Sequence, residues 1–329
     1  MSLQIRPMSL DDLGVAVEMA LEAYQRERTL CNALPNRPNV EYIHKQLQSI
    51  IKTGTACVAT EDETVVGFLA FGEAFAVQDG VYGATSPLFG YGVRHGRRDV
   101  IIGKLFQSIA AQLCERYVQS LRVNVYAHDA DVLWMYIATA FAMDVTQVVK
   151  NTSTPIQGKN TSPFTYREVC KSELVNYKQD VIDLYRELVN HLRVSPVFYH
   201  CRGFLPLEDR FDDFLSEKLR VFAAFEGENL IGIIDSEPVD IDLFKNDSQA
   251  LCMGDVFVKP NYRGEGVATN LLRFANDVLK NDGTERLFVT HGTINPNARG
   301  FWDKYFTNYT YTLTRIIDAD MLGVIERIE

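Results

Sequence analysis

The apolar and polar positions of the chain predict a strand, two helices and a hairpin near its start, and the same order of elements recurs in its second half. A short strand opens each half, and two stretches with apolar residues three and four positions apart follow it. The predicted strands are residues 3–6 and 164–169, the first helices 11–24 and 178–192, and the second helices 40–52 and 207–218. Ser9 and Asp12 have the spacing of a capping box at the start of the first helix.

The hairpin after these helices carries the strongest internal similarity. The segment ACVATEDETVVGFLAF, residues 56–71, aligns with VFAAFEGENLIGIIDS, residues 221–236, at an offset of 165, and the turn-rich EDET and EGEN lie within them. Further matches, at an offset of 166, are Arg97 with Arg263, Leu121 with Leu287, Val123 with Val289, Asp129 with Asn295 and Tyr136 with Trp302. A nearly constant offset over this length indicates an internal duplication.

The duplication predicts two domains in the 329 residues. The segment 150–163, KNTSTPIQGKNTSP, has no apolar periodicity and is rich in Ser, Thr, Asn, Gly and Pro, which is typical of a linker. We therefore place one domain at residues 1–149 and the other at 164–329. The order β-α-α-β-β-β-α-β-α-β in each half predicts the α/β class, with a mixed sheet covered by helices on both faces.

Charge and cysteine content exclude several classes of protein. The chain has 33 basic and 43 acidic residues, a net charge of −10 and no long basic run, which argues against a dedicated nucleic-acid-binding protein. Its six cysteines are scattered without a CxxC pair or a nearby His, so we expect reduced thiols and no metal site. The sequence has neither a signal-peptide pattern nor a membrane-length apolar run. We predict a soluble cytoplasmic protein with no membrane or nucleic-acid partner, and the oligomeric state stays open.

The segment GDVFVKPNYRGEGVATNLL, residues 254–272, is the most informative for function. An apolar strand at 256–258 stops at Pro260, and two glycines, Gly264 and Gly266, precede a helix. Glycines at a strand-to-helix junction let backbone amides point into one concavity at a helix N-terminus, which suits a pyrophosphate. A GxG pair also occurs in many turns that bind nothing. The segment lacks both the P-loop and the complete GxGxxG of dinucleotide-binding folds.

These residues resemble the GNAT superfamily of acetyl-CoA-dependent N-acetyltransferases. RGEGVA at 263–268 is similar to the pyrophosphate signature of that family, VKP at 258–260 to the strand end before it, and Asn295, Ala298, Phe301 and Trp302 to its later N-x-x-A-x-x-[LF]-[YW] pattern. The chain departs from the family after Trp302, where DKYFT replaces the usual Gly-Phe pair. The resemblance implies two tandem GNAT-like domains, each with a mixed, mostly antiparallel splayed sheet. It also implies that acetyl-CoA binds to Val256, Phe257, Val258, Arg263, Gly264, Glu265, Gly266, Val267, Ala268, Asn295, Ala298 and Trp302.

The first copy matches the family less well. In GVRHGRRDVII, residues 92–102, the offset of 166 puts Val100 in the place of Gly266, and a β-branched residue there would keep phosphate away from the backbone. The later block YIATAF, residues 136–141, still resembles the family's Y-x-x-x-[GA]-F. We therefore predict a degenerate GNAT-like domain that has lost its cofactor. Arg94, Arg97 and Arg98 then form either an anion site or, as we prefer, a solvated charge cluster.

The resemblance implies that an amine attacks the acetyl thioester directly, which requires a neutral amine and a proton for the leaving thiolate. Asp255 and His291 are the candidate bases; alternatively Asp255 caps a bulge, His291 satisfies a backbone carbonyl, and water carries the proton. The family often has an acidic Tyr where this chain has Trp302, and an indole cannot supply that proton. Tyr305, one helical turn later, is the candidate acid, unless it only packs in the core.

The acceptor is expected at the loop RVSPVFYHCRGF, residues 193–204. Tyr199, His200 and Arg202 would suit a small amine with an aromatic or anionic part, although the phenylalanines of this loop could equally pack between domains. The leading hypothesis is an acetyl-CoA-dependent N-acetyltransferase acting on a primary amine of a small molecule. The alternatives are a non-catalytic acyl-CoA-binding or regulatory protein, and a scaffold without cofactor. An acyl-enzyme on Cys252 is not favoured, because a small buried Cys usually only packs.

Overall fold

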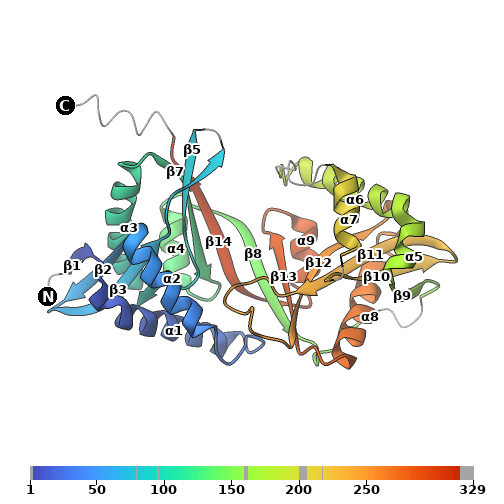
Figure 1. The fold of residues 1–329 in the computed structure, drawn as a ribbon, viewed down its shortest axis with the longest axis horizontal. Coiled ribbons are helices and arrows are strands. Elements are labelled where there is room, and N and C mark those ends of the chain that lie inside the picture. The colour runs from blue at the N-terminus through green and yellow to red at the C-terminus, as the bar shows by residue number, and fades with distance from the viewer. Residues whose placement is uncertain are drawn as a thin grey trace. The chain divides into compact units, whose positions relative to one another are not determined.

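The computed structural model describes residues 3–78, 80–94, 96–158, 162–199, 206–216 and 218–318. The chain forms two compact units: unit 1 comprises Met1–Gln147 and Asn308–Glu329, and unit 2 comprises Val148–Thr307. Figure 1 shows the consequence for unit 1, in which the red C-terminal strand lies among green and cyan strands from the first half of the chain. The predicted halves 1–149 and 164–329 therefore differ from the observed units at the end of the chain.

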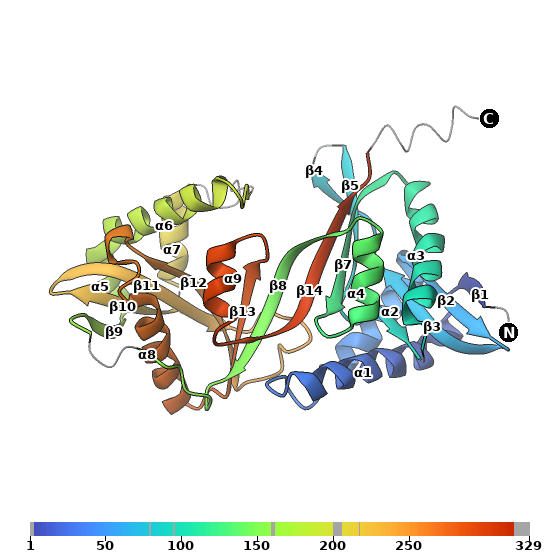
Figure 2. The same ribbon diagram turned by 180° about the vertical axis from the view of Figure 1, so that it is seen from behind.

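Except that two further strands lie between the hairpin and the strand that precedes the third helix, unit 1 follows the predicted order of elements. They are β1 (Gln4–Pro7), a 3-10 turn (Leu10–Asp12), α1 (Leu13–Leu30), α2 (Val40–Thr53), β2 (Thr55–Glu61), β3 (Thr64–Phe71), β4 (Phe75–Gln78), β5 (Val81–Ser86), β6 (Tyr91–Val93), α3 (Arg98–Cys114), β7 (Val118–Tyr126), α4 (Ala130–Ala138), the first part of β8 (Ala142–Asn151) and β14 (Thr307–Ile316). Four strands form one sheet in the order β1-β2-β3-β6, and β4, β5, β7, β14 and β8 follow one another in a second. Figure 2, the view from behind, shows α3 and α4 in front of these strands, on the side away from α1 and α2.

Unit 2 has a similar order of elements without the two further strands, and its strands join in one sheet. Its elements are β9 (Thr165–Val169), α5 (Lys171–Leu174), a 3-10 turn (Val175–Tyr177), α6 (Lys178–Arg193), α7 (Leu207–Phe214), β10 (Arg220–Glu226), β11 (Asn229–Pro238), β12 (Ala250–Val258), α8 (Val267–Asn281), β13 (Arg286–Gly292) and α9 (Pro296–Trp302). The strand order is β13-β12-β11-β10-β9, and only β12 and β13 pair in parallel. The prediction of a mixed, mostly antiparallel sheet is thereby confirmed.

The two faces of the unit 2 sheet are buried against different helices. Alternate residues of β10 divide between them, because side chains of a strand point to opposite faces in turn. Phe222 and Ala224 share a buried cluster with Leu271 of α8. Val221 and Phe225 instead share one with residues of α6 and α7, including Tyr185 and Phe214. Helices therefore cover both faces, as the sequence predicts.

The two hairpins of the internal repeat have the same geometry. Thr64 pairs with Glu61 across the first turn and Asn229 with Glu226 across the second. Both carry a bulge at equivalent places, after Ala59 and after its counterpart Ala224.

The predicted capping box of α1 is also present: the Ser9 amide donates to Asp12 Oδ2 at 2.8 Å. Local sequence patterns therefore predicted the hairpin turns and the capping box correctly.

The alignment of the phosphate loop with the first copy was wrong. Val93 and Val258 are equivalent, because they pair with Gly67 and Gly232 of the matching hairpins. Only residues 94–96 separate Val93 from Arg97, which precedes α3 with φ 101°, whereas residues 259–265 separate Val258 from the equivalent Gly266. Val100 therefore lies inside α3 and does not replace Gly266. The loop is shorter in the first copy than in the second, which an ungapped offset could not reveal.

A buried lysine ties the predicted linker to unit 2. Lys150 is 4% exposed, and its Nζ donates to the carbonyls of Asn151 and Thr154 and to Oδ1 of Asn276 on α8, at 2.8–2.9 Å. Burial lowers the pKa of Lys150 to about 8. Each of the three protons of the Lys150 ammonium group has an acceptor, which offsets the removal of its charge from water. These hydrogen bonds therefore hold the start of the linker against α8.

Candidate functional site

The sheet of unit 2 opens next to the predicted phosphate loop. β12 and β13 pair in parallel from Ala250 with Arg286 to Met253 with Val289. Beyond Met253, β12 continues to pair with β11 but no longer with β13. The backbone edge of β12 that faced β13 is therefore free to bind an extended ligand from Gly254 onward. Val256, Phe257 and Val258 lie on this stretch, as the resemblance implies.

The loop after β12 ends in two glycines with left-handed backbone conformation. Gly264 has φ 82° and Gly266 has φ 85°, and Gly266 directly precedes the first residue of α8. Residues with a Cβ rarely adopt this conformation, which explains the glycines. No side chain caps the N-terminus of α8, so its first amides keep their capacity to bind an anion. Val267 is buried in the core, while Glu265 is exposed.

Arg263 is held beside this loop by the end of the strand. Its Nε donates to the carbonyl of Val258 at 3.1 Å, and its guanidinium lies 4.9 Å from the centre of the Phe257 ring. The side chain is otherwise exposed, so the remaining N–H groups can reach a ligand phosphate. The side chain thus lies beside the loop from which the resemblance implies that it contacts the cofactor.

The two predicted bases lie on opposite faces of the sheet. Asp255 faces α6, where Oδ2 accepts a hydrogen bond from the hydroxyl of Tyr185 at 2.8 Å. His291 follows Leu287 and Val289 on the α8 and α9 face, and its side chain is 4% exposed. Its Nδ1 lies 3.3 Å from the Gly292 carbonyl and its Nε2 3.7 Å from Asp303. Burial lowers the pKa of His291 below its usual 6.5.

Asn295 caps α9 and lies close to a histidine that the sequence analysis did not select. Its Oδ1 accepts from the amides of Asn297 and Ala298 at 3.1 and 3.3 Å. The same oxygen lies 3.5 Å from Nε2 of His191, in the last turn of α6. His191 and Asn295 are 104 residues apart in the sequence, and the folded sheet brings them together. The only sequence signal for His191 was its place just before the predicted acceptor loop.

The aromatic residues of α9 and the turn after it mainly pack against one another. Trp302 is 4% exposed, with its indole edge-on to Phe301 and Phe306 at 4.9 and 5.4 Å between ring centres. Tyr305 packs against Phe301, and its hydroxyl lies 3.0 Å from the Thr269 hydroxyl in the first turn of α8. The alternative that Tyr305 only packs in the core thus has a contact to support it.

Residues 193–199 of the predicted acceptor loop are among the described residues. Tyr199 is 48% exposed, and its amide donates to the carbonyl of Leu192 at 2.7 Å. His200 and Arg202 lie outside the described residues. Of the predicted acceptor residues, only Tyr199 is therefore described, at the end of α6, while Asp255 lies beside Tyr185 on the α6 side of the sheet.

The corresponding opening in unit 1 is crossed by an ion pair. Arg98 donates from Nη1 to the carbonyl of Val93 at 2.5 Å and from Nε and Nη2 to the carboxylate of Asp129. Asp129 precedes α4 as Asn295 precedes α9. Arg94 forms ion pairs with glutamates of α1. The expectation of a solvated arginine cluster is therefore wrong for Arg98, which is 15% exposed and bridges β6 to α4.

Within the described residues, no group of three or more His, Cys, Asp or Glu side chains is placed to hold a metal ion. The helices in the same part of the chain include none with the length and apolar character needed to cross a bilayer. The five described cysteines are free thiols, and burial raises the pKa of Cys252 to about 11. A thiol with that pKa is almost entirely protonated at neutral pH and is a poor nucleophile.

A comparison with known families matches the segment that contains this site. Residues 185–306, from α6 to the turn after α9, match the model of the acetyltransferase (GNAT) family. A sequence comparison with curated proteins gives no match.

Solved structures extend the likeness to the whole chain. A GCN5-related N-acetyltransferase from Sphaerobacter thermophilus matches with a TM-score of 0.56, 10% identity and 95% coverage of both chains. A glucosamine N-acetyltransferase region of a fungal multi-domain GH3 β-N-acetylglucosaminidase matches with a TM-score of 0.50 and 14% identity, covering 96% of this chain and 38% of that one. At these identities the likeness establishes the fold, and the expectation of a GNAT fold from the sequence is confirmed.

Proposed function

We propose that the chain is an acetyl-CoA-dependent N-acetyltransferase that transfers an acetyl group to a primary amine of a small molecule, with the cofactor in unit 2. The observation that carries this proposal is the combination of Gly264 and Gly266 in left-handed conformation, an uncapped N-terminus of α8 and an open edge of β12. These features lie within the segment that matches the GNAT family model.

The proposed binding site divides between the loop and the strand. The amides of Val267 and Ala268, with Arg263 beside them, would bind the pyrophosphate, because both the helix dipole and the guanidinium favour anions. The free backbone edge from Gly254 to Val258 would pair with the amide groups of the pantetheine arm. Acetyl-CoA supplies the activated acetyl thioester, and the chain would hold this thioester in position for the amine.

The amine is proposed to enter on the α6 face of the sheet. Asp255 reaches this face and is oriented by the hydroxyl of Tyr185, so it is our preferred acceptor of the amine proton. His291 is less suited to that role, because it is buried on the other face and hydrogen-bonds the backbone next to it. His191 lies near the same edge, at the end of α6 and beside Asn295, and would contact the acceptor or orient water.

Tyr305 remains our candidate for the proton that the leaving thiolate takes up. Its hydroxyl already donates to, or accepts from, the hydroxyl of Thr269 in the first turn of α8. This contact fixes the hydroxyl on the α8 side of the sheet, on the face opposite to Asp255, and the thioester would have to lie within its reach. Trp302 is buried in the core, so its contribution to the cofactor site is proposed to be the packing of α9 against α8.

Calorimetric titration of acetyl-CoA into the wild type and into Gly266→Val tests the location of the cofactor. One equivalent should bind to the wild type and none to the variant, because valine resists a φ of 85°. Circular dichroism of both proteins controls for unfolding. If neither protein binds, the acetyltransferase proposal fails. If the variant binds fully, the cofactor site does not depend on this loop.

Turnover distinguishes an enzyme from the alternative, a non-catalytic acyl-CoA-binding protein. Release of free CoA thiol is followed with a panel of amines that includes glucosamine, polyamines, aminoglycosides and arylalkylamines. Binding of acetyl-CoA without thiol release from any of them would favour the alternative. With an active acceptor, Asp255→Asn should lower kcat by about 10²–10⁴-fold while acetyl-CoA still binds.

A further inference from the structure

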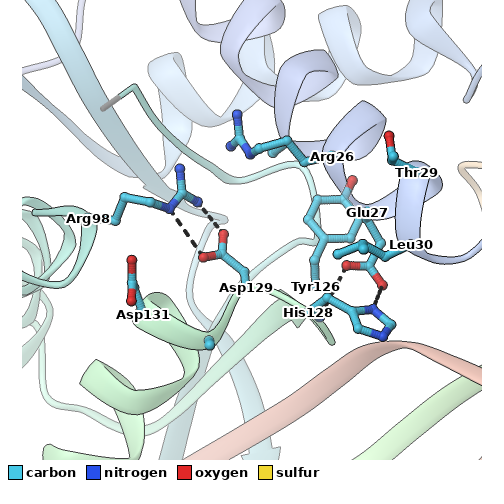
Figure 3. Close-up of a pocket in the computed structure, with 11 residues that line it drawn as sticks. Arg26, Glu27, Thr29, Leu30, Arg98, Tyr126, His128, Asp129 and Asp131 are labelled. Carbon is cyan, nitrogen blue, oxygen red and sulfur yellow. Dashed lines mark hydrogen bonds and ion pairs between the residues drawn. The ribbon is translucent and has the colours of Figure 1, made fainter. Parts of the chain in front are cut away.

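Two surfaces of unit 1 lie at opposite ends of β7. The first is a cavity of about 490 Å³ where β7 ends (Figure 3). Arg98 contacts Asp129 there and His128 contacts Glu27, and the lining holds three carboxylates and two guanidinium groups. These charges largely offset one another, so the lining does not favour an ion of either sign. The second surface, where β7 begins, is apolar.

Four neighbouring strands present one row of side chains where β7 begins, and Figure 2 shows these strands side by side. Phe75 of β4 pairs with Gly83 of β5, which pairs with Ser120 of β7. Ser120 in turn pairs with Ile316 of β14. Paired residues share a face of the sheet. Val77 lies on this face too, because a Cβ added to Gly83 would come within 2.7 Å of its Cγ2. We call these five residues the end row.

The end row exposes apolar side chains to water. Phe75 and Val77 are about half exposed, and Ile316 is 75% exposed. The two residues between them in the row are small and cover little of this surface. On the opposite face of the same strands, side chains such as Leu121 and Leu313 are buried. A contiguous exposed apolar patch is typical of a contact surface.

The chain leaves the described residues next to this row. The amide of Ile317 donates to the carbonyl of Gln119 at 2.8 Å, and the described part ends at Asp318. The sequence continues with residues 319–329, ADMLGVIERIE, which lie outside the described residues. A segment that follows directly on Asp318 starts beside the end row.

The sequence of residues 319–329 has the composition of a segment that packs on an apolar surface. Five of its eleven residues are apolar. They are Met321, Leu322, Val324, Ile325 and Ile328. Four of them have the spacing i, i+3, i+4, i+7, which is the pattern of one apolar helix face. The segment therefore carries an apolar side of its own that needs a partner.

The length of the segment is sufficient to cover the whole row. Three strand spacings separate β14 from β4 in the order β4-β5-β7-β14, which is roughly 14 Å. Eleven residues span about 16 Å as a helix and up to about 36 Å when extended. A segment tethered at Asp318 can thus reach from Ile316 to Phe75.

The charges of the segment also match this face of the sheet. Residues 319–329 include three acidic residues and one basic residue. Arg122 lies two residues after Ser120 on the same face of β7, and its side chain is 51% exposed and 3.9 Å from Asp144. A further carboxylate can therefore approach this guanidinium from the solvent side.

We propose that residues 319–329 cover the end row, with their apolar side packed on Phe75, Val77 and Ile316. The tether at Asp318 gives the segment a high effective concentration at the row, because its binding is intramolecular. This advantage favours it over a second copy of the chain or another protein. The surface belongs to unit 1 and is separate from the proposed cofactor loop.

Calorimetric scans of the full chain and of a chain ending at Asp318 test this contact. Val77→Thr together with Ile316→Thr makes the row less apolar and keeps β-branched side chains, which suit a strand. In the full chain these two substitutions should lower the melting temperature of unit 1 by at least about 4 °C. In the chain ending at Asp318 they should lower it at most about half as much, because no segment then covers the row. Trp134→Gln, at an exposed position on α4, is the matched control and should have the same effect in both chains.

Photo-crosslinking tests where the segment lies. Ile325 is replaced by p-benzoylphenylalanine in the full chain, and the crosslinked peptides are identified by mass spectrometry. Mixing isotope-labelled with unlabelled protein separates crosslinks within one chain from those between chains. The expected products join residue 325 to β4, β5 or the beginning of β7 of the same chain.

The remaining outcomes overturn the proposal. Equal shifts of the melting temperature in the two chain lengths would show that the segment does not contact the row. Crosslinks mainly between chains would assign the row to a second copy. Crosslinks to other parts of the same chain, or none, would place the segment elsewhere.

Discussion

The two substitutions Gly264→Ala and Gly283→Ala test the loop with a control built into the same unit. Both glycines have left-handed conformation, with φ 82° and φ 91°, and an added Cβ would meet no atom within 4 Å at either one. Gly264 lies in the proposed phosphate loop, whereas Gly283 follows the C-terminus of α8. The intrinsic cost of alanine should therefore be alike at both positions, and any difference should come from a ligand.

The cost to stability follows from the backbone conformation alone. A residue with a Cβ in the left-handed region costs about 1–2 kcal/mol. Since a change of 1 kcal/mol shifts the melting temperature of a unit of this size by about 2–4 °C, each variant should melt roughly 2–8 °C below the wild type. Both should remain folded at 25 °C, where binding is measured.

The affinity for acetyl-CoA should differ between the two variants. A phosphate lying against the backbone of the loop would collide with the new methyl at residue 264, so we expect Gly264→Ala to bind acetyl-CoA at least about 100-fold more weakly, a loss of about 2.7 kcal/mol. Gly283→Ala should keep the wild-type affinity in the same calorimetric titration. If both variants bind acetyl-CoA like the wild type, the assignment of the loop to the pyrophosphate is refuted. If both lose affinity equally, the loss comes from instability.

Three further predictions concern other parts of the chain. Lys150 has a pKa of about 8 when folded and an ordinary value of 10.5, so the unfolded state binds more protons between these values. The free energy of unfolding of the wild type should therefore rise by about 3 kcal/mol relative to Lys150→Met from pH 8 to 10.5, as measured by urea denaturation. Tyr185→Phe removes the hydrogen bond that orients Asp255, so it should lower kcat by roughly tenfold and leave the affinity for acetyl-CoA unchanged, and an unchanged kcat would argue against Asp255 as the base. A chain ending at Phe306 lacks β14 and should lose the cooperative unfolding of unit 1, whereas one ending at Asp318 should keep it; calorimetric scans of both would show whether β14 is dispensable.

Local patterns were sufficient to predict most elements and the loop of unit 2. The hairpins follow from alternating apolar residues and turn-forming residues, and the loop follows from its glycines and the apolar strand before it. The position of Val100 was predicted wrongly because the loop before α3 is four residues shorter than the loop before α8, while α3 and β7 are each two residues longer than α8 and β13, so the sequence offset changes only from 165 to 166. Pairing partners in the folded sheet, such as Val93 with Gly67, were needed to detect this.

Features that depend on contacts between distant parts of the chain could not be predicted from local sequence patterns. The proximity of His191 to Asn295 results from packing of α6 near an open sheet edge, which no short pattern encodes. The pairing of β14 with β7 joins residues far apart in sequence, for instance Leu313 with Val123, and repeated strands have several plausible partners. The contacts of Arg98 similarly require the fold, because charged residues near a helix start are usually solvated.

The position of β14 imposes an order on synthesis. β7 and β8 leave the ribosome early, but the strand that lies between them is made only after the whole of Val148–Thr307. At about 5–20 residues per second, this interval is on the order of 10 s. During that time unit 1 presents two strand edges without their partner, and such edges readily pair with other chains. Newly made protein should therefore depend on chaperones until translation ends, although the completed fold has both edges covered.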